Sequence, residues 1–184
     1  MHMDRSIYVE RTVRTDSTQI GSRMIIRRVR KGDNKLLADL IKQAFDEHGA
    51  PIEGTVYSDP TTDDLYGLFQ TDRSILWVAE EHGEVLGCCG IYPTRGLPDR
   101  CAELVKFYLL PKARGRGIGS KLMERNIDSA RKLGYTELYL ESVPEFDKAV
   151  RMYGKFGFKH LVKPLGESGH TACNIRMIKK LVEE

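Results

Sequence analysis

The segment RGRGIG, residues 114 to 119, stands between an apolar run and a helical pattern and strongly restricts how this chain can fold. Glycines at a turn from strand to helix permit left-handed backbone angles and let a ligand approach the backbone amides closely. The first turn of the following helix offers unpaired N–H groups and the positive end of the helix dipole, which together bind anions. Arg114, Arg116 and Lys121 add mobile positive charge. The segment therefore predicts a strand-turn-helix unit that holds a phosphate-bearing cofactor.

Two common phosphate-binding loops fit this segment poorly. A P-loop requires Gly-Lys-Ser/Thr after its second glycine, but Ser120 and Lys121 follow Gly119 in the reverse order. The dinucleotide fingerprint G-x-G-x-x-G requires a third glycine where Ser120 stands. A glycine-rich connector without a ligand is the alternative to a phosphate site.

Strand-like and helix-like patterns alternate along the rest of the chain. Apolar β-type runs predict strands at 24–29, 75–80, 85–92, 101–110, 137–142 and 171–178. Helical spacing and caps predict helices from an N-cap at Asp33 to Gly49, around 65–69, from the glycine segment to Gly134, and over 147–156. This order favours an α/β or α+β sandwich with helices on both faces of a central sheet.

The length and composition predict one domain. The chain has 184 residues, with 41% hydrophobic and 30% charged residues, which is ordinary for a globular protein. Residues 1–22 lack sustained periodicity and are expected to form a flexible N-terminal arm outside a single domain at 23–184. No apolar run is long enough to cross a bilayer and the N-terminus has no signal-peptide core, so we expect no membrane association and a cytoplasmic location.

The net charge and the cysteine spacing argue against nucleic-acid binding and against a metal site. A net charge of +3 is too small to predict nucleic-acid binding, and the basic run at 27–31 reads as a solvated strand end. The four cysteines form no CxxC pair and no zinc-type cluster with histidine, so we expect no metal site. They lie in strand-like segments and are expected to be buried, reduced thiols: Cys88, Cys89, Cys101 and Cys173.

Three motifs in one order resemble the GCN5-related N-acetyltransferase (GNAT) family. Residues 114–119 match the family's acetyl-CoA signature, Arg/Gln-x-x-Gly-x-Gly/Ala, without a gap. The preceding "ELVKFYLLP" resembles the family's fourth strand and "LYLES" its fifth strand. "AVRMYGKFGFKHL" resembles the Ala-x-x-x-Tyr-x-x-x-Gly-Phe segment. The resemblance covers about residues 24–181.

The resemblance implies a fold and a cofactor. The fold is a central mixed, mostly antiparallel sheet that splays into a V between strands four and five after a bulge in strand four. The amides of 116–120 would hold the pyrophosphate of acetyl-CoA, and backbone groups of 107–109 would bond the pantetheine and polarise the thioester carbonyl. The implied cofactor-binding residues are Phe107, Tyr108, Leu109, Arg114, Gly115, Arg116, Gly117, Ile118, Gly119 and Ser120.

The resemblance also implies catalytic residues. Glu103 lies eleven residues before Arg114, where histone-type relatives carry a general base that deprotonates the acceptor amine. Its apolar neighbours are expected to raise its pKa by desolvation. Glu141 is the second candidate, and a water chain is a third route for the proton. Tyr153 stands at the general-acid position, from which its hydroxyl can protonate the departing thiolate of CoA.

The acceptor is expected to be a primary amine on a small molecule or peptide. The C-terminal "GESGHTACNIRMIKKL" resembles a Gly-His-x-x-Cys-Asp segment of some bacterial relatives, which places His170 near the acceptor, although Asn174 replaces the Asp. The variable segment 47–69 is expected to decide specificity. Its carboxylates either attract a cationic amine or form a solvated loop and caps: Glu53, Asp59, Asp63 and Asp64.

Two functional classes lead, and a nucleic-acid-associated protein is a third hypothesis, which would use the basic residues Arg23, Arg27, Arg28, Arg30 and Lys31. The leading hypothesis is an acetyl-CoA-dependent N-acetyltransferase in which the amine attacks directly within a ternary complex. The alternative is a non-catalytic acyl-CoA-binding regulatory module with the same fold. A homodimer is compatible with the resemblance, but no sequence feature identifies its interface.

Overall fold

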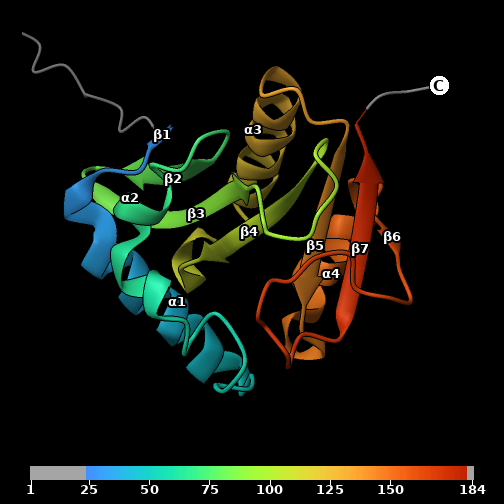
Figure 1. The fold of residues 1–184 in the computed structure, drawn as a ribbon. Helices are drawn as coiled ribbons and strands as arrows, with labels where there is room; N and C mark the ends of the chain where they lie inside the picture. Colours follow the sequence, from blue (N-terminus) through green and yellow to red (C-terminus); the bar gives the residue numbers. More distant parts are fainter. Residues whose placement is uncertain (1–23, 182–184) are drawn as a thin grey trace, which may run out of the picture.

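A computed structural model describes residues 24–181 as a seven-stranded sheet covered by helices (Figure 1). The N-terminal arm expected at 1–22 lies outside the described residues. The strands are β1 (Ile25–Arg28), β2 (Ile75–Glu81), β3 (Glu84–Tyr92), β4 (Cys101–Leu109), β5 (Glu137–Ser142), β6 (Lys159–His160) and β7 (Ile175–Lys180). The α-helices are α1 (Asn34–His48), α2 (Leu65–Leu68), α3 (Ile118–Lys132) and α4 (Asp147–Lys155), and a 3-10 turn, η2 (Pro60–Asp64), leads into α2.

The sheet is mostly antiparallel and opens at its centre. Its strand order is β1-β2-β3-β4-β5-β7-β6, and only β4 and β5 run parallel. These two strands pair from Cys101 to Glu103 against Glu137 to Tyr139, and beyond this point they diverge, as Figure 1 shows. The predicted mixed sheet with a V between strands four and five is therefore confirmed.

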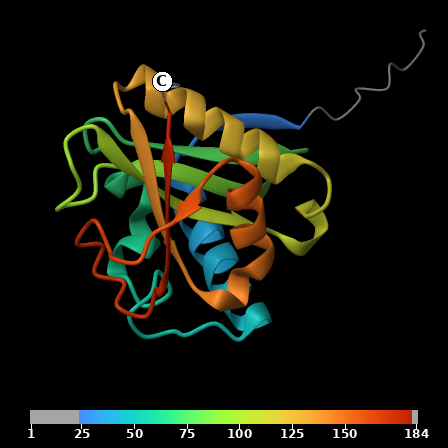
Figure 2. The same cartoon turned by 90° about the vertical axis from the view of Figure 1, so that its right-hand side faces the viewer.

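Apolar side chains on the two faces of the sheet form two cores. Along β2, Ile75 and Ala79 belong to the core under α3 and α4, whereas Leu76 and Val78 belong to the core under α1 and α2. This alternation is the period-two pattern of a strand that is buried on both faces. Figures 1 and 2 show α1 and α3 on opposite sides of the sheet.

A bulge interrupts β4 beside the V. Cys88 of β3 pairs with Tyr108, but Gly90, two residues on, pairs with Val105, so β4 carries one extra residue between these pairs. Lys106 takes up this irregularity with a left-handed φ of 54°. A bulge turns neighbouring side chains to one face. Val105 consequently packs against the α1 core, and Lys106 also points to this side, where it contacts Thr62 of η2.

A side chain of α3 forms a hydrogen bond with the β3 backbone opposite the bulge. Asn126 is fully buried, and its Nδ2 donates to the carbonyl oxygen of Cys89, the β3 residue opposite the bulge, at 3.1 Å. The same nitrogen donates to Leu122 O within the helix at 2.8 Å. A side-chain amide thus replaces a hydrogen bond that a regular ladder would supply.

The structure corrects three details of the sequence prediction. The last strand begins at Ile175 rather than at 171, because 171–174 form a turn in which Cys173 N donates to His170 O. Cys173 therefore lies outside a strand, although its thiol is buried and free as expected. The two-residue strand β6, which pairs with β7, was not predicted because two residues carry no periodicity.

Asp33 is the N-cap residue of α1, as predicted, but its side chain makes no capping hydrogen bond. The residue stands before α1, but its carboxylate forms an ion pair with Arg27 at 2.7 Å and accepts the backbone N–H of Arg30. It therefore ties β1 to the start of the helix instead of capping it. Gly49 ends the helix in a left-handed conformation, as predicted.

Among residues 24–181, no helix has both the length and the apolar character needed to cross a membrane.

Candidate active site

Three adjoining cavities occupy the open part of the sheet. The first, of about 360 Å³, is lined by the end of β4, the glycine segment, the start of α3, and residues of α1 and α4. The second, of about 520 Å³, is lined by the earlier part of β4, the segment around η2 and residues 167–170. A connecting cavity of about 80 Å³ shares residues with both, including Phe107 with the first and Glu103 with the second.

The glycine segment forms one wall of the first cavity. Gly115 and Gly117 have left-handed φ values of 74° and 76°, and Gly117 is the N-cap of α3. The first helical hydrogen bond of α3 runs from Lys121 N to Gly117 O, so the preceding amides of α3 have no acceptor within the helix. A Cβ on Gly119 would lie 3.2 Å from Leu109 Cδ1. The wall thus combines unpaired amides with a close approach of α3 to β4, which suits an anionic, phosphate-bearing ligand.

The two arginines of the segment form ion pairs with carboxylates of neighbouring elements. Arg114 donates from Nη2 to Glu47 at 2.7 Å and from Nε to Leu109 O at 3.1 Å. Arg116 forms an ion pair with Glu81 at 2.8 Å. Both guanidinium groups therefore have carboxylate partners in this structure.

Eight of the ten residues expected to bind the cofactor line the first cavity. They are Phe107, Tyr108, Leu109, Arg114, Gly115, Gly117, Gly119 and Ser120. Arg116 and Ile118 do not line it, and the Ile118 side chain is part of the core under α3. The cavity also receives residues of α1 and α4 that were not predicted, including His48, Lys148 and Met152. Sequence spacing alone does not show which faces of α1 and α4 meet β4.

Glu103 lies in both the second and the connecting cavity. Its side chain is almost completely buried, and its Oε2 accepts a hydrogen bond from Thr94 Oγ1. Burial raises the pKa of Glu103 from 4.5 to about 7, and nearby Glu141 acts in the same direction, whereas Thr94 opposes the rise. A carboxyl group with this pKa exchanges a proton readily near neutral pH.

Tyr153 reaches the connecting cavity from α4. Its ring packs against Phe107 and Phe158, with centroid separations of 6.0 and 5.9 Å. No described residue forms a hydrogen bond with its hydroxyl group. Burial raises the pKa of Tyr153 above its usual value, so the hydroxyl group keeps its proton near neutral pH and can donate a hydrogen bond.

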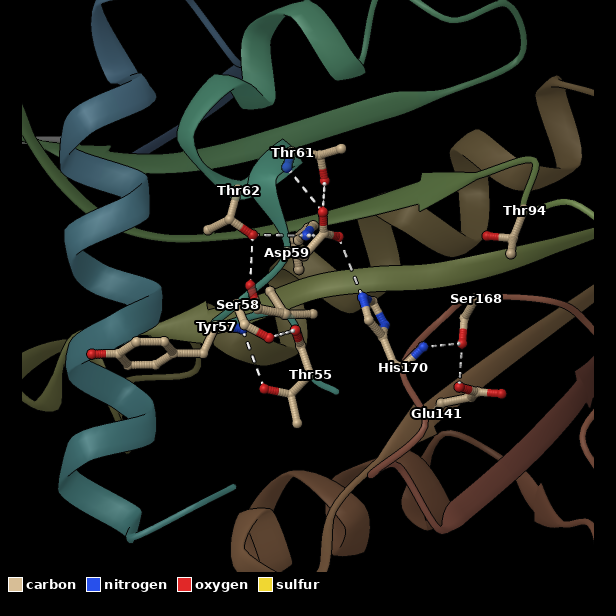
Figure 3. A network of polar contacts seen from close by, with 12 residues as sticks. Thr55, Tyr57, Ser58, Asp59, Thr61, Thr62, Thr94, Glu141, Ser168 and His170 are labelled. Carbon is tan, nitrogen blue, oxygen red and sulfur yellow. Dashed lines mark hydrogen bonds and ion pairs between the residues drawn. The ribbon is translucent and has the colours of Figure 1, made fainter. Parts of the chain in front are cut away.

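Glu141 and His170 belong to a polar network between β5 and the segment before η2 (Figure 3). Tyr139 and Ser168 donate to the two carboxylate oxygens of Glu141, at 2.7 and 2.6 Å. The backbone N–H of His170 donates to Ser168 Oγ, and Nε2 of the His170 ring lies 3.3 Å from Asp59 Oδ2. The network therefore joins two walls of the second cavity that are distant in sequence.

Asp59 occupies the centre of this network. Its Oδ1 accepts from the backbone N–H and the hydroxyl of Thr61, and its Oδ2 faces His170 (Figure 3). The contact with His170 is the main cause that holds the pKa of Asp59 well below its usual value. Two further acidic residues of this segment have structural partners: Asp63 pairs with Lys42 at 2.9 Å, and Asp64 accepts from Gly67 N.

Lys106 was missed by the sequence analysis. It lines the second cavity, its side chain is 4% exposed, and its Nζ lies 3.2 Å from Thr62 Oγ1 and 3.7 Å from Asp59 Oδ2. Burial lowers the pKa of Lys106, and Asp59 opposes that change. A single lysine inside the apolar run ELVKFYLL was the available signal.

Within residues 24–181, no three His, Cys, Asp or Glu side chains are grouped so that they could hold a metal ion.

Comparison with known proteins agrees with this architecture. A sequence model of the acetyltransferase (GNAT) family matches residues 38–158. An uncharacterized N-acetyltransferase of Escherichia coli strain K12, YjgM, is 35% identical over 158 residues, which cover 85% of this chain and 95% of the relative. A second relative, an uncharacterized N-acetyltransferase of Schizosaccharomyces pombe, is 36% identical over 65% of this chain and 72% of its own length. The chain therefore belongs to the GNAT family and is an acyltransferase of the N-acetyltransferase class.

Solved structures share the fold. An N-acetyltransferase from Staphylococcus aureus Mu50 has a TM-score of 0.70 and 25% identity, with 88% of this chain and 100% of that chain covered. The yncA protein of Salmonella typhimurium, solved with its cofactor acetyl-CoA, has a TM-score of 0.68 and 23% identity over 89% of this chain and 96% of that chain. The overall fold of this chain is thus shared with these proteins.

Proposed function

We propose that the protein transfers the acetyl group of acetyl-CoA to a primary amine that enters the second cavity and attacks the thioester directly within a ternary complex. The observation that carries this proposal is the position of Glu103. Its buried carboxyl group, with a pKa of about 7, lies where the second cavity meets the connecting cavity. A group of this kind is suited to take a proton from an ammonium ion at neutral pH.

The first cavity is the proposed site of acetyl-CoA. The left-handed Gly115 and Gly117 and the first amides of α3 supply backbone donors for the pyrophosphate. The absence of a side chain at Gly119 keeps the space beside Leu109 and Phe107 open. The end of β4, residues 107–109, offers backbone groups toward the pantetheine and the thioester carbonyl. Acetyl-CoA supplies the activated acyl group, and these donors stabilise the oxyanion that develops when the amine attacks.

Glu103 is the proposed general base. An amine is mostly protonated at neutral pH and attacks only after it loses a proton. The carboxylate of Glu103 accepts this proton directly or through a water molecule. Glu141 is the reserve candidate, but both of its carboxylate oxygens already accept hydrogen bonds, from Tyr139 and Ser168. Its role in the proposal is to support the network around His170.

Tyr153 is the proposed donor to the leaving group. A carbon–nitrogen bond forms, the carbon–sulfur bond breaks, and the sulfur leaves with the bonding electron pair. The Tyr153 hydroxyl, which has no partner among the described residues, donates its proton to this thiolate and then regains one from solvent. A phenol held in the protonated form by burial is a weak acid, so its main contribution is a hydrogen bond to the developing thiolate.

Release of CoA from acetyl-CoA, followed with a thiol reagent, tests the proposal. The assay covers polyamines, amino acids, aminoglycosides and short peptides, each with wild-type protein and with Glu103→Gln. Amine-dependent release that is lost in Glu103→Gln, while acetyl-CoA binding measured by calorimetry is retained, supports the assignment. Release at the same rate with and without amine, or equal rates for both proteins, contradicts it.

A further inference from the structure

We infer that the second cavity binds an acceptor that carries a carboxylate close to its amine, such as an α-amino acid, and that Lys106 binds this carboxylate. The inference deepens the proposed function and rests on it for the role of the bound molecule as acceptor. Three observations support it. Lys106 has unfilled hydrogen-bond donors, the bulge in β4 places it beside Glu103, and the other charged residues nearby already have protein partners.

The ammonium group of Lys106 has more hydrogen-bond donors than acceptors among the described residues. An ammonium has three N–H donors. Among the described residues, Thr62 Oγ1 is its one partner within hydrogen-bond distance, at 3.2 Å, while Asp59 Oδ2 at 3.7 Å is close enough only for an ion pair. The side chain is 4% exposed, so bulk water does not surround the group. Unfilled donors on a buried cation are costly, and an anionic ligand in the cavity would fill them.

The bulge in β4 places this cation beside the proposed base. In a regular strand, Glu103 and Lys106 would point to opposite faces, because three positions separate them. The left-handed φ of Lys106 turns its side chain to the face of Glu103, and both residues line the second cavity. A ligand with its carboxylate at Lys106 therefore presents an amine on a neighbouring carbon toward Glu103.

The other charged residues that line the second cavity near Lys106 already have protein partners, so Lys106 is the group proposed to bind an anion. Asp59 already has contacts with Thr61 and His170, so its carboxylate is not free to recruit a cationic substrate. At the rim, the exposed Arg95 forms an ion pair with Glu167 at 3.1 Å. A simple diamine would thus meet no unpaired carboxylate except Glu103 itself and would leave the donors of Lys106 unfilled.

The experiment compares α-amino acids with their α-carboxamides and their decarboxylated amines. Rates of CoA release are measured for each series, and binding is measured by calorimetry on protein saturated with CoA, which cannot transfer an acetyl group. The variants are Lys106→Met and the matched control Lys42→Met, which removes an ion pair to η2 outside the second cavity. Wild-type protein alone tests the preference, so the inference stays falsifiable if Lys106→Met does not fold.

We expect at least one amino acid to bind about tenfold more tightly than its amide, as a charge-assisted hydrogen bond implies. Lys106→Met removes this preference and Lys42→Met retains it. Two results would overturn the inference. One is equal affinity of the wild type for amino acids and their amides, and the other is an equal loss of affinity for amino acids and amides in Lys106→Met. A Lys106-dependent preference in binding without CoA release from acetyl-CoA upholds the carboxylate site and contradicts the proposed acetyl transfer.

Discussion

The side chains of Glu103 and Lys106 line the same cavity, although an odd number of positions separates them on β4. The extra residue opposite Cys89 and the left-handed φ of Lys106 explain this placement. One strand therefore presents a carboxyl group of raised pKa and a buried ammonium group to the same space.

Replacing Glu103 with Gln is expected to lower kcat by about 10²- to 10⁴-fold, the usual contribution of a general base. The base must be ionised to act, and the pKa of Glu103 is about 7, so wild-type kcat/KM rises with pH through about 7. In Glu103→Gln we expect kcat/KM no longer to rise with pH in this range. The measurement is a pH–rate profile at saturating acetyl-CoA, with the exposed Glu124→Gln in α3 as control. Persistence of the pH-dependent limb in Glu103→Gln would assign the base to another group, and Glu141→Gln would then be measured.

Glu103 also predicts how stability depends on pH. Burial raises its pKa from 4.5 to about 7, so the native state binds this proton more tightly than the unfolded chain. The resulting stability is fully present below pH 4.5 and is lost as the pH rises through about 7. The free energy of unfolding of Glu103→Gln, which does not ionise, should gain about 2–3 kcal/mol relative to wild type between pH 4.5 and pH 8. Urea unfolding of both proteins at several pH values measures this difference, and parallel pH curves would contradict it.

Replacing Gly119 with Ala tests the shape of the first cavity. The added Cβ would lie 3.2 Å from Leu109 Cδ1 and 3.3 Å from Phe107 Cζ, so these side chains must shift within the cavity that they line. We expect acetyl-CoA to bind about tenfold more weakly, a cost in the usual range for overpacking. Gly154→Ala is the matched control, because Gly154 lies in α4 with nothing within 4 Å of the added atom. The control should retain wild-type affinity in a calorimetric titration, and unchanged affinity in Gly119→Ala would refute the assignment.

Replacing Tyr153 with Phe removes the hydroxyl and keeps the ring contacts with Phe107 and Phe158. We expect kcat to fall by about tenfold or more, with nearly unchanged acetyl-CoA affinity, because the hydroxyl acts on the departing thiolate. Single-turnover rates and a binding titration separate the two effects. Tyr135→Phe is the control, since the Tyr135 hydroxyl donates to Arg73 O away from the three cavities. Turnover equal to wild type in Tyr153→Phe would remove this residue from the mechanism.

Local sequence signals predicted the elements with strong periodicity. β5 spans 137–142 as expected, and Gly49 and the glycine segment mark the end of α1 and the start of α3. The start of β7 was predicted too early because the turn at 171–174 is held by a tertiary contact, from Ala172 N to Gly54 O. Such a contact leaves no periodic trace in the sequence.

The candidate site was predictable only in part. The resemblance pointed to Glu103 and Tyr153, and both side chains lie in the connecting cavity. Lys106 was missed, because the period-two rule directs it away from Glu103 until the bulge is known. Thr94, which bonds to Glu103, comes from the loop after β3, and nothing in the spacing of that loop indicates where it folds back.

The two ends of β4 line different cavities, and this separation bears on how such enzymes diversify. On the proposed function, the earlier residues of the strand and the segments around Asp59 and His170 meet the amine, whereas residues 107–109 and the glycine segment meet the donor. Substitutions on the amine side can therefore accumulate without altering the groups that activate the thioester. A lineage with this architecture can acquire a new acceptor through changes in two surface segments while it inherits its donor chemistry intact.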